Sequence, residues 1–342
     1  AARPAQAAAV TCLDSLLVCA VRVRADELGV PGMACFCWFG NESIREAMNA
    51  SKHESRLLPV ASLLFSATLW GVVWYPLRLL EQQGLAGAWS ALISYSAALV
   101  VMLWVFVRDR DALGQNLWPL VLMSLAAGWC NVAFIMAVLD GNVVRVLLLF
   151  YLSPFWAVCL GWFMLDERLD SKSLQVFVIA VTGALVMLWN EDVGMPWPRS
   201  NADWLAVSSG FAFALSNVFV RRMQNVSVAL KAVSSWSGVL VMALLWIGLS
   251  RTGLPGVGVP VLFQAVLLGV CGFLVMTLSV FYGVTRMPVH RSAVILLFEL
   301  VAGALSSLWL TDEVVLLQEW LGGLMIVTAA WLAARIHAGD AA

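Results

Sequence analysis

Residues 145–167 read RVLLLFYLSPFWAVCLGWFMLDE, and residues 291–313 read RSAVILLFELVAGALSSLWLTDE. Each stretch begins with Arg, continues as a long apolar run and ends with Asp-Glu, and the second follows the first at an offset of 146 residues. An internal repeat of this length is a repeated structural unit, and it fixes the architecture of the chain. The sequence therefore predicts two related halves, each built from long apolar helices.

The composition places these helices in a membrane. Hydrophobic residues make up 62% of the chain and charged residues 12%, whereas soluble domains have roughly 45–50% and about 25%. Because backbone polar groups in lipid must be satisfied within each segment, we expect an all-helical polytopic membrane protein. A net charge of −1 and the lack of a basic patch argue against nucleic acid as a partner.

Ten segments approach the length of about 20 apolar residues that spans a bilayer. They divide into a first repeat over 57–189 and a second repeat over 204–335, with five helices in each. The ten segments are 57–79, 88–107, 117–139, 143–165, 173–189, 204–220, 232–249, 260–285, 292–311 and 319–335.

Residues 1–56 are expected to be an extension that precedes this fold. They contain no run long enough to span a membrane. Met48 and the sequence NASKHESRLLPVASLL that follows it are typical of a natural start before a first membrane helix. We therefore interpret residues 1–47 as upstream translation or an artefact, without a fold of their own.

The seven cysteines indicate neither a disulfide framework nor a metal site. Cys130, Cys159 and Cys271 stand alone in apolar segments, where cysteine acts as a small hydrophobic residue. Cys35 and Cys37 are one residue apart, and no histidine follows at a ligand spacing. We expect no metal and no cofactor.

Lys and Arg in the short loops predict the orientation. With the N-terminus in the cytoplasm, twelve of these residues lie inside and four outside, so both termini are expected to face the cytoplasm of a bacterial inner membrane. The inner set is Lys52, Arg56, Arg108, Arg110, Arg168, Lys172, Arg221, Arg222, Lys231, Arg286, Arg291 and Arg335, and the outer set is Arg78, Arg145, Arg199 and Arg251.

Five helices in a half is an odd number, so the second half is predicted to be inverted relative to the first. A second repeat match supports this prediction. LFSATLWGVVWYPLR ends at Arg78, and SSGFAFALSNVFVRR ends at Arg222, an offset of 144. Repeats of this kind are typical of secondary transporters, whose binding sites lie between the two halves.

The chain resembles the drug/metabolite transporter superfamily and, within it, the EamA family of ten-helix carriers. The resemblance covers about 57–335 and is carried by Trp70-Gly71, by LLFYLSPFWAVCLGWFMLDERL in the fourth helix and by LLFELVAGALSSLWLTDE in the ninth. It implies two inverted five-helix repeats around a central cavity, lined mainly by helices one, three, four, six, eight and nine, and transport by alternating access. The family often has Pro after the ninth-helix Glu. This chain has Leu300 there, which puts the expected kink in doubt, although Pro154 is present in the fourth helix.

Glu299 is the most informative single residue, because it is an acidic side chain well inside an apolar segment, ILLFELVAG. A medium of low dielectric constant favours the neutral form of a carboxyl group, so Glu299 is a candidate for carrying a proton or contacting a solute. The alternative is a carboxyl group that only ties helices together, through Asn217 or Tyr282. The repeat places Ser153 at the position equivalent to Glu299.

Other polar and aromatic groups lie deep in the segments. Trp70 and Trp74 are four residues apart and share one face of the first helix, where they suit flat organic solutes or cations. Ordinary packing is the alternative for each of them. The full candidate set for solute binding is Glu299, Trp70, Trp74, Asn131, Tyr151, Ser153, Asn217 and Tyr282.

Charged residues at the ends of the two repeated helices have two interpretations. Arg145 and Arg291 are suited to anionic solutes at the cavity mouths, but extension toward lipid headgroups is the favoured reading. Asp166-Glu167 and Asp312-Glu313 each close one helix and are expected to act structurally, near the N-terminus of the next helix.

The leading hypothesis is a secondary transporter of a small organic metabolite or drug, acting in efflux and coupled to protons through Glu299. A lipid or lipid-linked sugar translocase on the same fold is the alternative. A membrane enzyme is disfavoured, because His53, His290 and His337 lie in loops or at ends and Glu299 has no acidic partner. A receptor that does not transport is disfavoured by the inversion. A homodimer is left open.

Overall fold

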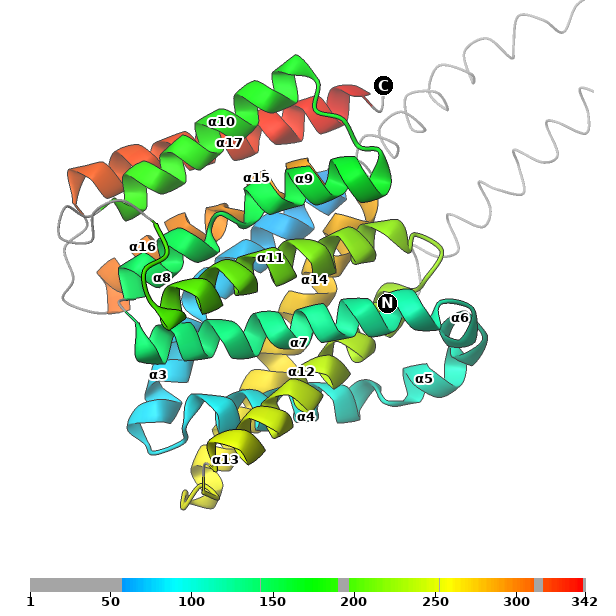
Figure 1. Cartoon of the computed structure of the whole chain (residues 1–342), viewed down its shortest axis with the longest axis vertical. Coiled ribbons are helices and arrows are strands. Elements are labelled where there is room, and N and C mark those ends of the chain that lie inside the picture. The colour runs from blue at the N-terminus through cyan, green and yellow to red at the C-terminus, as the bar shows by residue number, and fades with distance from the viewer. Residues whose placement is uncertain (1–56, 142, 190–196, 252, 311–315, 341–342) are drawn as a thin grey trace, which may run out of the picture. The chain divides into compact units, whose positions relative to one another are not determined.

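The computed structural model describes residues 57–141, 143–189, 197–251, 253–310 and 316–340, all within the compact unit Ser55–Ala342 (Figure 1). The expectations for residues 1–56, Asp312 and Glu313 therefore lie outside the described residues. In the described part, nine helices are long and apolar enough to cross a membrane, and the shorter apolar helix Gly87–Met102 is the tenth segment. This confirms the all-helical membrane fold.

The first half contains five spans. The first, Leu57–Gln82, ends in α3 (Trp74–Gln82), and the second is α4 (Gly87–Met102), followed by the short helices α5 (Trp104–Arg108) and α6 (Arg110–Gln115). The third span is α7 (Leu117–Asp140). The fourth is divided into α8 (Val143–Phe150) and α9 (Ser153–Leu165), and the fifth is α10 (Ser171–Leu188).

The second half repeats this order. The sixth and seventh spans are α11 (Asn201–Arg222) and α12 (Val228–Ser250). The eighth consists of α13 (Val259–Leu267), a π-helical turn η1 (Leu268–Phe273) and α14 (Leu274–Arg286). The ninth is divided into α15 (Val289–Leu296) and α16 (Phe298–Leu310), and the tenth is α17 (Leu317–Asp340).

Polar caps place three helix starts earlier than the apolar segments indicate. Asp170 accepts a hydrogen bond from the Ser173 amide at 3.2 Å and begins α10. Ser200 begins α11 in a capping box, and Ser227 begins α12. Helix α12 therefore includes Lys231, whose side chain is fully buried, and the interpretation of Lys231 as a loop charge is wrong.

Matching hydrogen bonds relate the two halves. The Ser66 hydroxyl in the first span donates to the Met276 carbonyl in α14 at 2.9 Å. At the equivalent place in the other half, the Ser209 hydroxyl in α11 donates to the Cys130 carbonyl in α7 at 2.8 Å. Each bond joins a span of one repeat to a span of the other, so the two five-helix repeats are interleaved.

Two close helix crossings show the same relation. A Cβ on Gly238 in α12 would overlap the backbone of Ser124 in α7, and a Cβ on Gly269 in η1 would overlap the backbone of Ser94 in α4. Gly238 is the repeat equivalent of Ser94, and Gly269 is the equivalent of Ser124. The close crossing is therefore present in both halves. The glycine lies on the second helix of its repeat in one crossing and on the third helix of its repeat in the other, and the serine lies on the partner helix.

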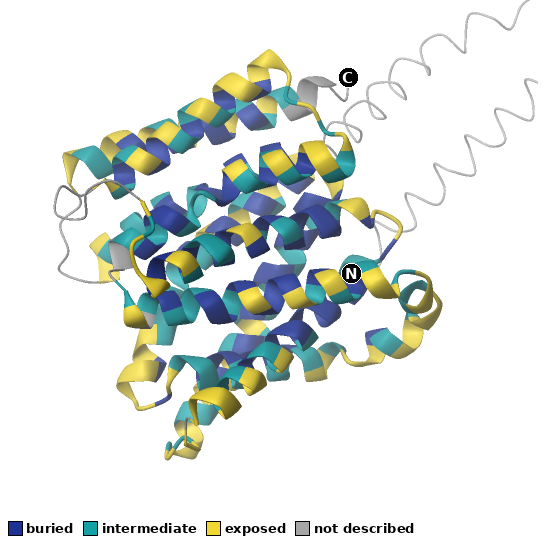
Figure 2. Ribbon diagram, viewed as in Figure 1, coloured by how far each residue is buried: buried dark blue, intermediate teal, exposed yellow. Residues whose placement is uncertain are grey.

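The fifth and tenth spans pair with each other. Helices α10 and α17 run side by side in Figure 1, and the backbones of Gly183 and Gly322 meet where they cross. Among the described spans α11 has the largest buried share, 61% of its apolar stretch, and Figure 2 shows buried residues concentrated in the middle of the bundle.

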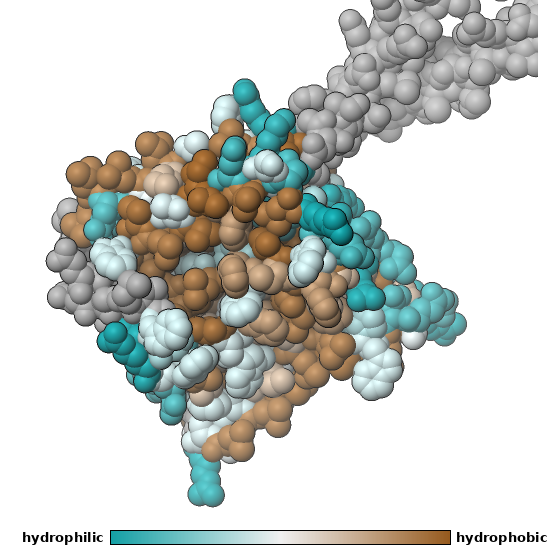
Figure 3. Space-filling model, turned by 45° about the horizontal axis from the view of Figure 1, so that its top comes forward, coloured by the Kyte–Doolittle hydropathy of each residue, from teal (hydrophilic) through white to brown (hydrophobic). Residues whose placement is uncertain are grey.

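Large apolar side chains cover much of the outside. Phe163 is 82% exposed, Trp309 81% and Leu249 79%. Figure 3 shows hydrophobic side chains over a broad part of one face of the described unit, with hydrophilic residues gathered at its margins. Such a surface is unfavourable in water and suits contact with lipid.

Both repeated helices are interrupted near their middle. In the fourth span Pro154 has no N–H, so the Phe150 carbonyl loses its helical partner, and the helix breaks at Tyr151 and Leu152. In the ninth span the break falls at Leu297, where the Leu300 amide donates to the Leu297 carbonyl at 3.0 Å. The ninth-helix interruption is therefore present although the chain has Leu300 in place of Pro.

Candidate functional site

A cavity lies between the two interrupted spans and α11, and it also touches the end of α14. The atoms around it leave about 440 Å³ of free space, counting the part that opens outward. Its lining comes from both repeats and is formed by Phe150, Tyr151, Ser153, Pro154, Ala157, Phe213, Ala214, Asn217, Val284, Val289, Ser292, Ala293, Leu296, Leu297 and Glu299.

Glu299 and Tyr151 meet in this cavity. Tyr151 lies in the break of the fourth span, Glu299 lies just after the break of the ninth, and their side chains line the same cavity close enough to interact electrostatically. The carboxyl group is half-buried and faces the cavity. The two breaks thus bring one carboxyl group and one phenol together from opposite repeats.

Ser153 and Asn217 line the same cavity. The exposed fraction is 4% for Ser153 and 6% for Asn217. Four of the eight candidate residues, Glu299, Tyr151, Ser153 and Asn217, are therefore neighbours around one space. Their role in solute binding stays a prediction.

The other four candidates lie elsewhere. Trp70 packs against Phe273, with ring centroids 5.8 Å apart, and Trp74 donates from its indole nitrogen to the Ser306 hydroxyl at 2.9 Å. Asn131 accepts a hydrogen bond from the Tyr95 hydroxyl at 3.1 Å and lines a separate apolar crevice between α4, α7 and α12. None of these lines the cavity around Glu299.

Tyr282 is the fourth of them. The guanidinium carbon of Arg286 lies over its ring, 3.7 Å from the ring centroid. Tyr282 does not line the cavity around Glu299, whereas Tyr151 and Asn217 do.

Two aromatic residues of the lining were not among the candidates. Phe150 directly precedes Tyr151, and Phe213 is four residues before Asn217 and so lies on the same face of α11. That spacing is the signal that could have identified Phe213. Among the described lining residues only Glu299 carries a carboxyl group, and there is no Lys, Arg or His.

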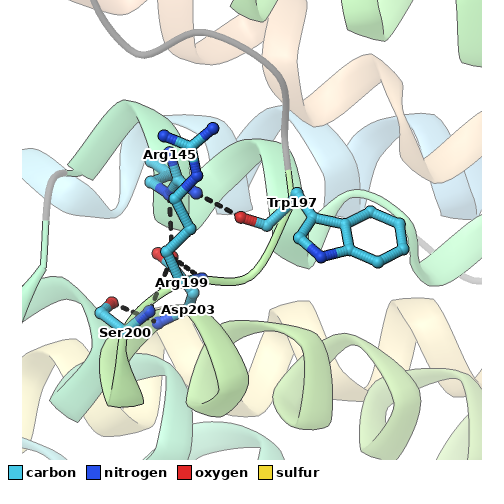
Figure 4. Close-up of polar contacts among 5 residues, drawn as sticks. All are labelled: Arg145, Trp197, Arg199, Ser200 and Asp203. Atoms are coloured by element: carbon cyan, nitrogen blue, oxygen red, sulfur yellow. Dashed lines mark hydrogen bonds and ion pairs between the residues drawn. The ribbon is translucent and has the colours of Figure 1, made fainter.

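Arg145 forms an ion pair within the protein (Figure 4). Its Nε lies 2.9 Å from Oδ2 of Asp203, and its guanidinium group also donates to the Trp197 carbonyl. Asp203 further accepts from the amides of Arg199 at 2.7 Å and Ser200 at 3.2 Å. The pair joins the start of the fourth span to the start of the sixth, and it gives Arg145 a counter-ion within the protein that neither interpretation from the sequence included.

Arg291 is also buried, at 9% exposure, and faces the cap of α10. The Ser173 side chain, assisted by backbone amides and by the charge of Arg291, holds the pKa of Asp170 below its usual value.

Glu167 does not lie at the start of α10, where the sequence placed it. One carboxylate oxygen pairs with Arg221 Nε of α11 at 2.9 Å, and the other accepts the Val289 amide of α15 at 2.7 Å. The expected electrostatic effect is present, but at the N-terminus of a helix from the other repeat.

The family comparison agrees with this architecture. The sequence matches the model of the EamA-like transporter family twice, over residues 57–189 and 200–335. No curated protein matches the chain closely enough to count as a relative.

A solved structure whose title reads only "Crystal structure of protein" has a similar fold. It has a TM-score of 0.64 and 16% identity, and the match covers 83% of this chain and 97% of the other. At this identity the likeness concerns the fold alone. Two interleaved repeats that each match the same family model establish that the chain belongs to the EamA-like transporter family.

Proposed function

We propose that this protein is a secondary transporter that moves a small organic solute through the cavity around Glu299 by alternating access. The observation that carries the proposal is the meeting of Glu299 and Tyr151 at the two helix breaks, between repeats of opposite orientation. Binding sites of secondary transporters lie at repeat interfaces near interrupted helices.

The lining favours a solute with an amine or another cationic group. Glu299 supplies negative charge, and Phe150, Tyr151 and Phe213 supply aromatic rings. Aromatic faces attract organic cations, and the lack of a basic side chain among the described lining residues disfavours anions. Asn217 and Ser153 add neutral hydrogen-bonding groups, which suit the polar parts of amino acids, amines, nucleosides or drugs.

Proton coupling follows from competition for one carboxyl group. A cationic solute binds to the carboxylate form of Glu299, which lies beside Tyr151 in the cavity. When Glu299 takes up a proton, the carboxyl group becomes neutral and the cation loses its counter-charge. One proton is then exchanged for one solute cation, which in a bacterial inner membrane drives the solute outward.

We further propose that the end of the bundle that carries Glu167 faces the cytoplasm, together with both termini. The bias of Lys and Arg in the short loops supports this orientation.

The test is Glu299→Gln in proteoliposomes. The amide keeps the shape of the side chain and its place beside Tyr151 but cannot exchange a proton, so we expect uptake driven by a pH gradient to be abolished. Glu319→Gln is the matched control, because Glu319 accepts the exposed Leu316 amide at the start of α17, away from the cavity. Both variants should elute as the unmodified protein does on size exclusion. Unchanged proton-driven uptake in Glu299→Gln would remove Glu299 from the mechanism.

A further inference from the structure

Helix α15 forms one wall of the cavity. Val289, Ser292, Ala293 and Leu296 all line it, and this i, i+3, i+4, i+7 spacing places them on one face of the helix. Displacement of α15 would therefore open the cavity along its length.

The same helix is bounded by a discontinuity at each end. Met287 is extended, with φ −124° and ψ 152°, between α14 and α15, and the break at Leu297 separates α15 from α16. Helix α15 is thus an eight-residue half-helix between the extended residue Met287 and the turn at Leu297, where φ is −59° and ψ is −16°. Such positions are where hinge motions are absorbed.

The N-terminus of α15 is capped by a residue of the connection between α9 and α10. Its own N-cap residue, Pro288, provides no side-chain hydrogen bond. The Val289 amide instead donates to the Glu167 carboxylate at 2.7 Å. A carboxylate at a helix N-terminus satisfies an amide and interacts favourably with the helix dipole, so Glu167 stabilises α15 from the opposite repeat.

Local structure holds Glu167 in place for this contact. Asp166 adopts the left-handed conformation, with φ 55°, and the Glu167 amide donates back to the Gly161 carbonyl at 3.1 Å. This is a common way to end a helix, and Asp tolerates it better than most side chains. Arg221 then fixes the carboxylate with a side-chain pair that is only 15–20% exposed on either partner.

The neighbouring helix α14 is tied separately. Arg221 donates to the Thr285 carbonyl at 2.8 Å. Lys231 donates to the Val220 carbonyl at 2.8 Å and to the Thr285 hydroxyl at 2.9 Å. These bonds join the ends of α11, α12 and α14, so α14 remains attached to α11 if α15 moves away.

The two ion pairs bind the fourth and sixth spans at both ends. Arg145 pairs with Asp203 where these spans begin, and Glu167 pairs with Arg221 where they end. The fourth and sixth spans therefore form one unit, against which α15 can move.

We propose that α15 is a gate and that Glu167 holds it in the closed position at this end of the cavity. Opening breaks the hydrogen bond between the Val289 amide and Glu167, while the Glu167–Arg221 ion pair persists. The proposal rests on the proposed alternating-access function. Glu167 is a positioning residue, since it contacts the gate and not the solute.

The test measures access to the cavity without any solute. In a cysteine-free background, Ser292→Cys places a small reporter on the cavity face of α15, where Ser292 is 1% exposed. The rate of reaction with a membrane-impermeant maleimide is measured from each side of sealed vesicles. Adding Glu167→Gln should raise the rate about tenfold from the side of Glu167, because a charge-assisted hydrogen bond is replaced by a weaker neutral one.

Two further variants distinguish the effect of the Glu167–Val289 hydrogen bond from that of the Glu167–Arg221 ion pair. Asp203→Asn, the same chemical change at the opposite end of the same two spans, should leave the rate within about twofold of the reporter alone. The double variant Glu167→Arg with Arg221→Glu restores an ion pair between the spans. Because Arg cannot accept a hydrogen bond from the Val289 amide, the cysteine at position 292 should still react fast.

An unchanged rate in Glu167→Gln, or a return to slow reaction in the charge-reversed double variant, would overturn the proposal. If Glu167→Gln does not accumulate in the membrane, the double variant alone decides. Because no solute is present, failure of the proposed amine transport would not affect these rates.

Discussion

At the scale of single residues, the sequence identified the polar half of the site better than the aromatic half. Glu299, Tyr151, Ser153 and Asn217 were found because a polar group inside an apolar segment is costly in lipid and must face the protein interior. Trp70 and Trp74 do not line the cavity, because the Trp70 ring packs against Phe273 and the Trp74 indole nitrogen donates to Ser306. The ion pair of Arg145 could not be predicted, because its partner, Asp203, is 58 residues away in the sequence.

Gly238 allows the closest crossing between the two repeats. We predict that Gly238→Ala destabilises the protein by about 1–3 kcal/mol or more, since the added methyl group would overlap the backbone of Ser124 and force α12 away from α7. The melting temperature in detergent measures this effect.

Gly248→Ala is the control on the same helix, because a Cβ there meets nothing within 4 Å. This variant should leave the melting temperature unchanged or raise it, because alanine has a higher helix propensity than glycine. Equal melting temperatures for the two variants would show that the crossing is not tightly packed.

At the scale of the elements, the apolar segments predicted every span but not the positions where helices begin. The caps Ser200 and Ser227 add polar first turns that hydropathy does not count. The break in the fourth span was predictable from Pro154, because proline removes a hydrogen bond. The break at Leu297 has no such signal in its own residues, and the structure shows it as a hydrogen bond from Leu300 that spans three residues instead of four.

This geometry predicts that Leu300→Pro is tolerated. Leu300 lies in the first turn of α16 and its amide makes only the three-residue bond to the Leu297 carbonyl, so the variant loses that one bond and should lose less free energy of unfolding than a proline inside the helix. Ala304→Pro, one turn further on, removes an interior hydrogen bond and should cost about 3 kcal/mol or more. Thermal unfolding of the two variants in one detergent compares them directly, and a larger loss in Leu300→Pro would contradict the break at Leu297.

At the scale of the whole molecule, the inverted repeat was visible in the sequence and is confirmed in the fold. The offsets of the repeated motifs, near 145 residues, reappear as the paired bonds of Ser66 and Ser209 and as the exchanged crossings of Gly238 and Gly269. The interleaving of the halves could not be predicted, because it depends on contacts between residues far apart in the chain. The Glu167–Val289 contact is one of these: it joins residues 122 positions apart, and neither residue is unusual in its own segment.

The inversion is tested most directly by labelling two positions that the repeat makes equivalent. Arg168 follows the first Asp-Glu, and Val314 follows the second at the same offset of 146. Each is replaced singly by cysteine in a cysteine-free background, and a membrane-impermeant maleimide is added to intact cells and to inside-out vesicles. We expect Arg168→Cys to react only in inside-out vesicles and Val314→Cys only in intact cells. Reaction of both cysteines from the same side would contradict an inverted pair of repeats and, with it, a cavity that opens alternately to the two sides of the membrane.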